Sequence, residues 1–408
     1  MPLLTVFSMT FAHADSIVTK LAAATGYKIL TDEDLIKRAS EASGFPADKL
    51  MRAFQARTSV FNRFTCEKER SIAALRLSLA EKLDKEGFIV HGFSSQLLPR
   101  NLSPTLRLGL AADLNSRIRS VREEHDDMAQ EEASIRLQCD DQDRTAWVKS
   151  VTGAEDPWDS ALYDLVLSTD QPAEDEIVVT VLEMLQDLAE RITDEPGKTF
   201  DDFRLSAQVE SILAREGHIV GVSAEQGEVL LTIYKPVLLP NLLQEELERL
   251  AGSIAGVRSV SVQIAPAPFQ TDFYRKCDPA DLSRVLLVDD EREFVQTLSE
   301  RLLMRDVGSV VVYDGESALE CIYGDEPEVM ILDLKMPGMN GFEVLRRTKE
   351  ERPSIEVIVV TGHGTETDRK ICMELGAFAC FQKPIDIDVL CRALREANEK
   401  AAQSRHRA

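Results

Sequence analysis

The sequence has little positive charge. Its 47 lysine and arginine residues face 70 aspartate and glutamate residues, which gives a formal net charge of −23 at pH 7. Because DNA and anionic membranes attract basic surfaces, this balance argues against general binding to either of them. No basic recognition helix is evident near the C-terminus, so we expect no nucleic-acid partner and no transcription factor.

Long apolar runs and paired cysteines are also missing. No apolar run reaches about 18 residues, so we expect no membrane span. The start, MPLLTVFSMTFAHA, lacks the basic region of a signal peptide, although Ala12-His13-Ala14 imitates a cleavage site. We interpret it as a strand entering a helix and expect a cytoplasmic protein. The seven cysteines show no CxxC or zinc spacing, which predicts reduced and mostly packed thiols.

What the chain does have is a strand with an acid at its end. With 408 residues it should hold two to four domains. Within it, Met330 to Gly341 reads MILDLKMPGMNG, a short apolar run that stops at Asp333. Pro337-Gly338 and Asn340-Gly341 then favour turns. The pattern predicts a buried parallel strand with a carboxylate at its carboxyl end, where open α/β sheets bind ligands.

Three more apolar runs end in polar residues. They alternate with helix-like segments, so the C-terminal part should form a doubly wound parallel α/β sheet. Since neighbouring strands lie about 4.8 Å apart, their end groups can meet at one site. The groups are Asp289 and Asp290 after 285–288, Thr361 after 358–360, and Lys383 after 379–381.

The charges indicate what this site needs. Two carboxylates about 5 Å apart repel by roughly 3 kcal/mol at an effective dielectric of 20. Asp289, Asp290 and Asp333 would therefore raise one another's pKa unless a cation joined them. An all-oxygen cluster suits Mg²⁺. With the Lys383 ammonium and the Thr361 hydroxyl, these groups match the needs of phosphoryl transfer to an aspartate.

Residues from Val285 to about Glu399 resemble the receiver domain of two-component response regulators. The resemblance lies in LLVDDE, ILDLKMPGMNGFEVL, VVTGHG and the Lys383-Pro384 pair. It implies a flavodoxin-like sheet with strand order 2-1-3-4-5 over residues 284–402. It also implies that Asp333 accepts a phosphoryl group from a sensor histidine kinase or a phosphotransfer protein.

The same resemblance implies roles for the other residues. Mg²⁺ would be held by Asp290, Asp333 and the backbone carbonyl of Lys335, with Asp289 acting through water. Thr361 and Lys383 would contact the phosphoryl oxygens, and the Lys383-Pro384 bond would be cis. His363 is better read as a solvated loop histidine than as a phosphate ligand.

One position departs from the receiver pattern. The family usually carries Tyr or Phe three residues before the lysine, as a gate that moves with the threonine, and this position is Cys380 here. Phe381 should face the other side of the sheet, because side chains alternate along a strand. Cys380 is therefore a switch position without the usual aromatic ring.

The N-terminal part opens as a strand, a loop, a helix and a second strand. A phosphate-binding loop at this place would carry GxxxxGK[ST], but residues 8–16 read SMTFAHADS, without glycine or lysine. Bulky side chains and Asp15 should oppose an anionic ligand there.

Residues up to about Leu188 nevertheless resemble the cytidylate-kinase-like family of P-loop phosphotransferases. The resemblance lies in LAAATGYKILTDEDLI, GFIVHGFSSQLL and TGAEDPWDSALYDLVLSTD. It implies a lid that contains Asp141 and Arg144, with Asp143 at a position expected to be basic. We predict that the domain 1–195 is a P-loop-kinase-like fold without catalytic activity, and that the charged run 117–142 is a solvated helix.

A smaller module lies between these parts. Residues 200–266 predict an αββαβ order and resemble a BON domain, especially in Gly227-Glu228-Val229 and in 256–260. A small α+β spacer or dimerising module is the alternative. Residues 193–198 and 267–283 are predicted linkers, the second one stiffened by prolines.

Together these features predict a response regulator phosphorylated on Asp333. With no basic surface and no catalytic loop, its output should be protein–protein contact through the N-terminal domains, and a homodimer is possible. The alternative is a nucleoside monophosphate kinase of the cytidylate type under receiver control.

Overall fold

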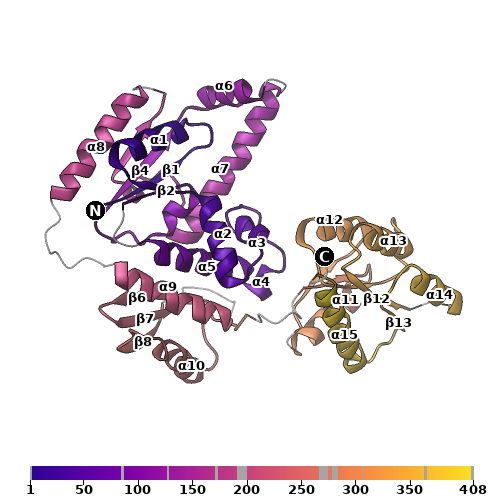
Figure 1. Cartoon of the computed structure of the whole chain (residues 1–408). Helices are drawn as coiled ribbons and strands as arrows, with labels where there is room; N and C mark the ends of the chain where they lie inside the picture. The colour runs from indigo at the N-terminus through magenta and orange to yellow at the C-terminus, as the bar shows by residue number, and fades with distance from the viewer. Residues whose placement is uncertain are drawn as a thin grey trace. The chain divides into compact units, whose positions relative to one another are not determined.

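The computed structural model divides the chain into two compact units (Figure 1). The first unit comprises residues 1–58 and 67–275, and the second comprises 59–66 and 276–408. The structure describes residues 2–83, 87–125, 128–170, 173–190, 200–265, 274–277, 284–305, 307–362 and 365–405. Both predicted linkers therefore lie mostly outside the described residues, and the domain boundaries drawn from the sequence remain predictions.

A five-stranded parallel sheet forms the centre of the first unit, in the order β2-β3-β1-β4-β5. Side chains alternate along its central strand. Leu4 and Val6 enter a core with helices α1 and α8, whereas Leu3 and Phe7 enter a second core with α2 and α5. The strands are β1 (Leu3–Ser8), β2 (Lys28–Leu30), β3 (Phe88–His91), β4 (Thr105–Ala111) and β5 (Leu165–Ser168).

Some of the helices around this sheet have recognisable caps. Thr31 and Asp34, for example, form a reciprocal capping box at the start of α2, and Gly26 ends α1 in the left-handed conformation. The helices are α1 (Ala14–Thr25), α2 (Asp32–Ser43), α3 (Ala47–Arg52), α5 (Glu67–Lys82), α6 (Leu114–Glu124), α7 (Gln130–Thr152) and α8 (Glu174–Glu190).

The predicted solvated helix over 117–142 is wrong in two respects. The segment forms two helices, the C-terminal part of α6 and the N-terminal part of α7, with a break after Glu124. Arg117, its first residue, is buried, and its guanidinium pairs with Asp141 across the two helices. The mixed charge pattern reflects this helix–helix pairing and not exposure alone.

The first unit also contains the small module with the predicted αββαβ order. Its elements are α9 (Phe200–Arg215), β6 (Gly221–Glu225), β7 (Glu228–Ile233), α10 (Pro240–Gly252) and β8 (Ser259–Ile264). β6 and β7 are antiparallel, and β7 and β8 are parallel. Phe203 and Ala207 of α9 lie in the same core as α2 and α5, so the module packs directly on the larger fold.

A second five-stranded parallel sheet forms the centre of the second unit. Its order is β10-β9-β11-β12-β13, which is 2-1-3-4-5 when its strands are numbered along the chain. Helices cover both faces: α12 and α13 pack against Leu286 and Val288, and α11 and α15 against Val285 and Leu287. The strands are β9 (Val285–Val288), β10 (Ser309–Val312), β11 (Val329–Leu332), β12 (Glu356–Thr361) and β13 (Ala379–Gln382). The helices are α11 (Arg292–Leu303), α12 (Gly315–Asp325), α13 (Gly341–Glu351), α14 (Glu366–Glu374) and α15 (Ile387–Arg405).

A short segment from the N-terminal half, Ser59–Cys66, belongs to this second unit. It contains the one-turn helix α4 (Asn62–Thr65). Phe61 is fully buried in the core that contains Leu319 and Ile322 of α12. The Val60 N–H donates to Asp325 Oδ1 (3.1 Å), and Arg63 donates to the Ser309 carbonyl oxygen (3.0 Å).

The prediction of reduced cysteines is wrong for two of them. Cys66 and Cys277 form a disulfide with a Cα–Cα distance of 6.0 Å, a usual separation for such a bond. They lie 211 residues apart, so their spacing in the sequence gave no hint of the pairing. Among the described residues, Cys139, Cys321, Cys372, Cys380 and Cys391 form no disulfide.

The sequence also predicted that no segment spans a membrane. Over the described ranges, no helix combines the length and the apolar character that crossing a bilayer requires.

Candidate functional site

Two acids lie side by side at the carboxyl edge of the second sheet. Strands β9 and β11 are neighbours, with Val288 opposite Leu332, and Asp289 and Asp333 are the next residues of each. The Asp333 N–H donates to the Val288 carbonyl oxygen (2.9 Å), which extends the ladder by one residue. Both aspartates are at most 5% exposed. Adjacent strands therefore present two buried carboxylates at the same level.

Lys383 reaches these acids from β13. Its N–H donates to the Thr361 carbonyl oxygen (3.0 Å), and its peptide bond to Pro384 is cis, as the resemblance implied. Lys383 Nζ lies 2.7 Å from Asp289 Oδ2 and 3.6 Å from Asp333 Oδ1. One ammonium group thus faces both carboxylates.

The electrostatics follow from this geometry. Burial raises the pKa of Asp289, and the Asp333 charge adds to the rise, although the Lys383 ammonium and the Glu291 N–H oppose it. Burial by itself would lower the pKa of Lys383, but hydrogen bonds to Asp289 and Glu291 outweigh burial and raise it. Lys383 is therefore held in its charged form, as a site for a further negative charge requires.

The loop after β11 fixes the Asp333 carboxylate. Its Oδ2 accepts the Lys335 N–H (2.7 Å), and the Gly341 N–H donates to the Leu334 carbonyl oxygen (3.1 Å). A Cβ at Gly341 would collide with the Asp333 backbone oxygen, so only glycine fits this close approach. The predicted turn residues thus hold the loop tightly under the carboxylate.

The remaining predicted residues lie as follows. Thr361 is buried at the end of β12, the strand between β11 and β13. Asp290 is half-buried and makes no hydrogen bond or ion pair among the described residues. Cys380 and Phe381 pack into the cores on opposite faces of the sheet, as strand alternation predicted. His363 lies outside the described residues.

Two residues at this site were missed by the sequence reasoning. Glu291 accepts a hydrogen bond from Lys383 Nζ (2.9 Å). The Phe294 ring lies 4.2 Å from the same Nζ, which places the ammonium over an aromatic face. The available signal was position: both residues follow the acids of β9 within the next helical turn and a half.

The site's fit to a metal ion rests on donor chemistry. Among the described residues, no three His, Cys, Asp or Glu side chains group closely enough to hold an ion by themselves. The donors here are all oxygen atoms, from two buried carboxylates, Asp290 and the nearby backbone. This set fits a hard ion such as Mg²⁺, which usually keeps several of its waters. The full predicted ligand set remains a prediction.

The corresponding edge of the first sheet forms a cavity of about 880 Å³ around the loop after β1. The loop lacks glycine, yet Phe11 (φ 59°) and His13 (φ 53°) adopt the left-handed conformation that favours it. Arg144 is the only arginine or lysine among the cavity's lining residues, all of which the structure describes. The carboxylates that line it are those of Asp15, Asp32, Glu33, Glu123 and Glu124.

Arg144 and Arg117 in this region already bind other groups of the protein. Arg144 donates to the Ser8 carbonyl oxygen (2.7 Å), and Arg117 pairs with both oxygens of Asp141 (2.8 and 2.9 Å). Asp143 accepts the Ala56 N–H (2.7 Å). The structure therefore places the predicted lid residues in internal contacts, beside an acidic cavity that opposes a polyphosphate.

Comparison with known families agrees with both resemblances. A family model for the response regulator receiver domain matches residues 285–395, and a model for the cytidylate kinase-like family matches residues 4–171. These two ranges do not include residues 200–266, so the BON-like resemblance stays a prediction.

Individual relatives match the C-terminal part. The transcriptional regulatory protein CpxR of Escherichia coli (strain K12) is 35% identical over 114 residues, which are 28% of this chain and 48% of CpxR. This chain thus spans about half the length of that relative. Sporulation initiation phosphotransferase F of Bacillus subtilis (strain 168) is 33% identical over 113 residues and is covered to 91%. A receiver domain structure from Clostridium thermocellum shows 27% identity and a TM-score of 0.28, covering 29% of this chain and 96% of that one.

Proposed function

We propose that Asp333 accepts a phosphoryl group from a phosphohistidine donor. The premise is that the chain, through residues 285–395, belongs to the response regulator receiver family. The donor would be a sensor histidine kinase or a phosphotransfer protein, which places the protein in the cytoplasm with its donor. The observation that carries the proposal is the Lys383 ammonium facing two buried carboxylates at adjacent strand ends.

The chemistry is a displacement at phosphorus. An Asp333 oxygen forms the new P–O bond while the P–N bond of the donor breaks, and the leaving imidazole takes up a proton. The Asp333 carboxylate is the nucleophile, and Lys383 Nζ lies 3.6 Å from its Oδ1. As the phosphoryl group arrives, Lys383 and the Thr361 hydroxyl would bind its oxygens.

Asp289, Asp290, Asp333 and the Lys335 carbonyl would hold Mg²⁺. When bound, the ion neutralises negative charge on the phosphoryl oxygens. Lys383 must then shift its contacts from Asp289 and Glu291 toward the phosphoryl group. This rearrangement is the first step of the switch that we propose. Because Cys380 stands where the family usually has an aromatic ring, the change must reach the rest of the unit by another route.

The output that we propose is protein–protein contact, through the N-terminal half or as a homodimer. The acidic cavity and the internally paired Arg117 and Arg144 argue against the alternative, a nucleoside monophosphate kinase. Mixing the full chain with ATP and CMP separates the two ideas, because only an active kinase would form CDP.

Phosphorylation can be tested on the full chain with acetyl phosphate and Mg²⁺. We expect a phosphate that is labile to hydroxylamine and detected by Phos-tag electrophoresis or intact mass. Asp333→Asn should abolish it, whereas Asp368→Asn, which alters only the exposed cap of α14, should not. Equal labelling of Asp333→Asn and the parent chain would end the proposal.

A further inference from the structure

A second cavity, of about 580 Å³, lies inside the first unit and away from the loop after β1. It is bounded by the sheet face that carries Thr5 and Arg107, by the segment after the short 3-10 helix Phe93–Leu97, and by α9, β6 and β7. A volume of this size is typical of pockets for small organic ligands. The αββαβ module therefore closes a pocket against the kinase-like fold.

Arg107 is the unusual residue in this cavity. It sits in the centre of β4 opposite Thr5, and only 8% of it is exposed. Among the described residues its guanidinium donates only to the Pro99 carbonyl oxygen (2.5 Å) and contacts no carboxylate. Burial lowers the pKa of Arg107 to about 10, and nearby Arg100 adds to the fall, although Asp164 opposes it.

Asp164, which accepts the Arg107 backbone N–H (2.7 Å), partly offsets this positive charge but is not a lining residue. The one carboxylate among the lining residues is that of Glu210, and it has another partner. Arg76 of α5 pairs with Glu210 of α9, so those two charges cancel. Arg100 is exposed at the rim and makes no hydrogen bond or ion pair among the described residues. Two guanidinium groups near each other, in a chain with net charge −23, present a local excess of positive charge.

The remaining lining combines hydroxyl groups with apolar surface. Ser206, Ser223 and Thr232 contribute hydroxyls, and Phe203 and Leu162 contribute apolar walls. Guanidinium groups bind phosphate in a bidentate manner, and two of them match the charge of a phosphate monoester, which is close to −2 at pH 7.

We propose that this cavity binds a small organic phosphate monoester, with the phosphate on Arg100 and Arg107 and the organic part against Phe203. The site would give the N-terminal half a ligand-sensing role that the acidic cavity after β1 cannot provide. It does not depend on the phosphorylation of Asp333, so the two proposals can fail separately.

Calorimetric titration of the full chain tests this, in EDTA so that Mg²⁺-dependent binding at Asp333 is absent. The probes are phenyl phosphate, benzoate and phenol, which share a ring and carry charges near −2, −1 and 0. We expect saturable 1:1 binding that weakens in that order. Arg107→Gln should weaken phenyl phosphate about tenfold or more, because it removes a charged hydrogen bond.

Two further variants keep the test decisive. Arg100→Ala removes the rim charge without touching a structural contact and should weaken phenyl phosphate several-fold. Arg122→Ala removes an equal charge from the exposed side of α6 and should leave affinity unchanged. The proposal is overturned if phenyl phosphate gives no saturable binding, if phenol binds as tightly, or if Arg100→Ala behaves like Arg122→Ala. Should Arg107→Gln fail to fold, the Arg100→Ala result decides.

Discussion

The chain contains two five-stranded parallel sheets with different sites at their carboxyl edges. In the second unit, Lys383 lies among Asp289, Asp333 and Glu291, and under the proposed function it would exchange these contacts for contacts with a phosphoryl group. In the first unit, Arg117 and Arg144 are bound to the protein itself and the cavity carries mainly acids. Parallel sheet topology thus gives both sheets a position for a site. Whether an anion can bind there depends on how firmly the cationic side chains are bound to groups of the protein.

The largest expected effect concerns Phe61, because it tests whether the second sheet depends on the separate segment Ser59–Cys66. Phe61→Ala removes a fully buried ring from the core beside α12, which should destabilise the second unit by about 3–5 kcal/mol. Urea unfolding of the full chain, followed by a probe on the second unit, measures this. Val60→Ala is the matched control, because Val60 is 43% exposed and keeps its backbone bond to Asp325. Equal effects of the two variants would mean that this segment is not part of the unit.

Lys383→Met tests the transferable cation itself. It keeps much of the side chain's apolar length but removes the charge between Asp289 and Asp333. We expect acetyl phosphate labelling of Asp333 to slow by about a hundredfold, the usual loss when a donor to developing negative charge is removed. Lys370→Met, on the exposed side of α14, should label at the parent rate. Undiminished labelling of Lys383→Met would show that the site works without this lysine.

Arg117→Met probes the opposite arrangement in the first unit. Arg117 is buried, but its partner Asp141 is 39% exposed, so water can replace part of the lost pairing. We expect a loss of about 1–3 kcal/mol in unfolding free energy, less than for a fully buried pair. The exposed Arg122→Met should change stability little. If Arg117→Met were neutral, this pair would not be what holds α6 against α7.

Local patterns predicted much of the second site. Apolar runs ending in Asp289, Asp333, Thr361 and Lys383 identify strand ends, and parallel topology brings strand ends together. Contacts between distant segments were beyond such reasoning: neither the docking of Phe61 nor the Cys66–Cys277 bond leaves a periodic or spacing signal.

The cationic cavity of the first unit was also missed, although it left a trace in the sequence. Arg107 interrupts the run TLRLGLA, where strand alternation on a two-sided sheet calls for apolar residues. A charged residue at the centre of such a strand marks a buried polar site, and the loop residues around Pro99 and the module around α9 complete it only in three dimensions.

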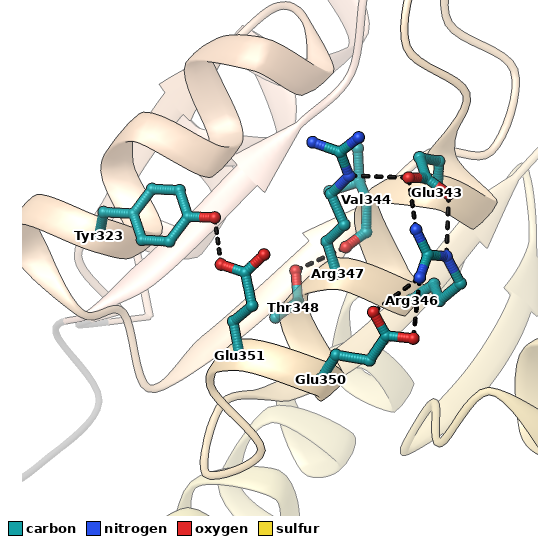
Figure 2. A network of polar contacts seen from close by, with 8 residues as sticks. All are labelled: Tyr323, Glu343, Val344, Arg346, Arg347, Thr348, Glu350 and Glu351. Carbon is teal, nitrogen blue, oxygen red and sulfur yellow. Dashed lines mark hydrogen bonds and ion pairs between the residues drawn. The ribbon is translucent and has the colours of Figure 1, made fainter.

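The smallest expected effect concerns ion pairs that are exposed to water. On α13, Arg346 bridges Glu343 and Glu350, and Arg347 also contacts Glu343 (Figure 2). Hydrogen bonds from the two arginines lower the pKa of Glu343 to about 2 from 4.5. Because the folded-state pKa is the lower one, the stabilisation is complete above about pH 4.5 and is lost as the pH falls toward 2.

Arg346 is 43% exposed, so water and salt screen these pairs. Arg346→Ala should therefore lower the Tm by no more than about 4 °C at pH 7, and by less in 1 M NaCl or below pH 4. Differential scanning calorimetry over pH and salt measures this, with Arg395→Ala, on the exposed side of α15, as the control. A salt-independent loss of stability as large as that of Phe61→Ala would contradict this expectation. It would mean that this exposed network stabilises the unit as strongly as a buried core residue does.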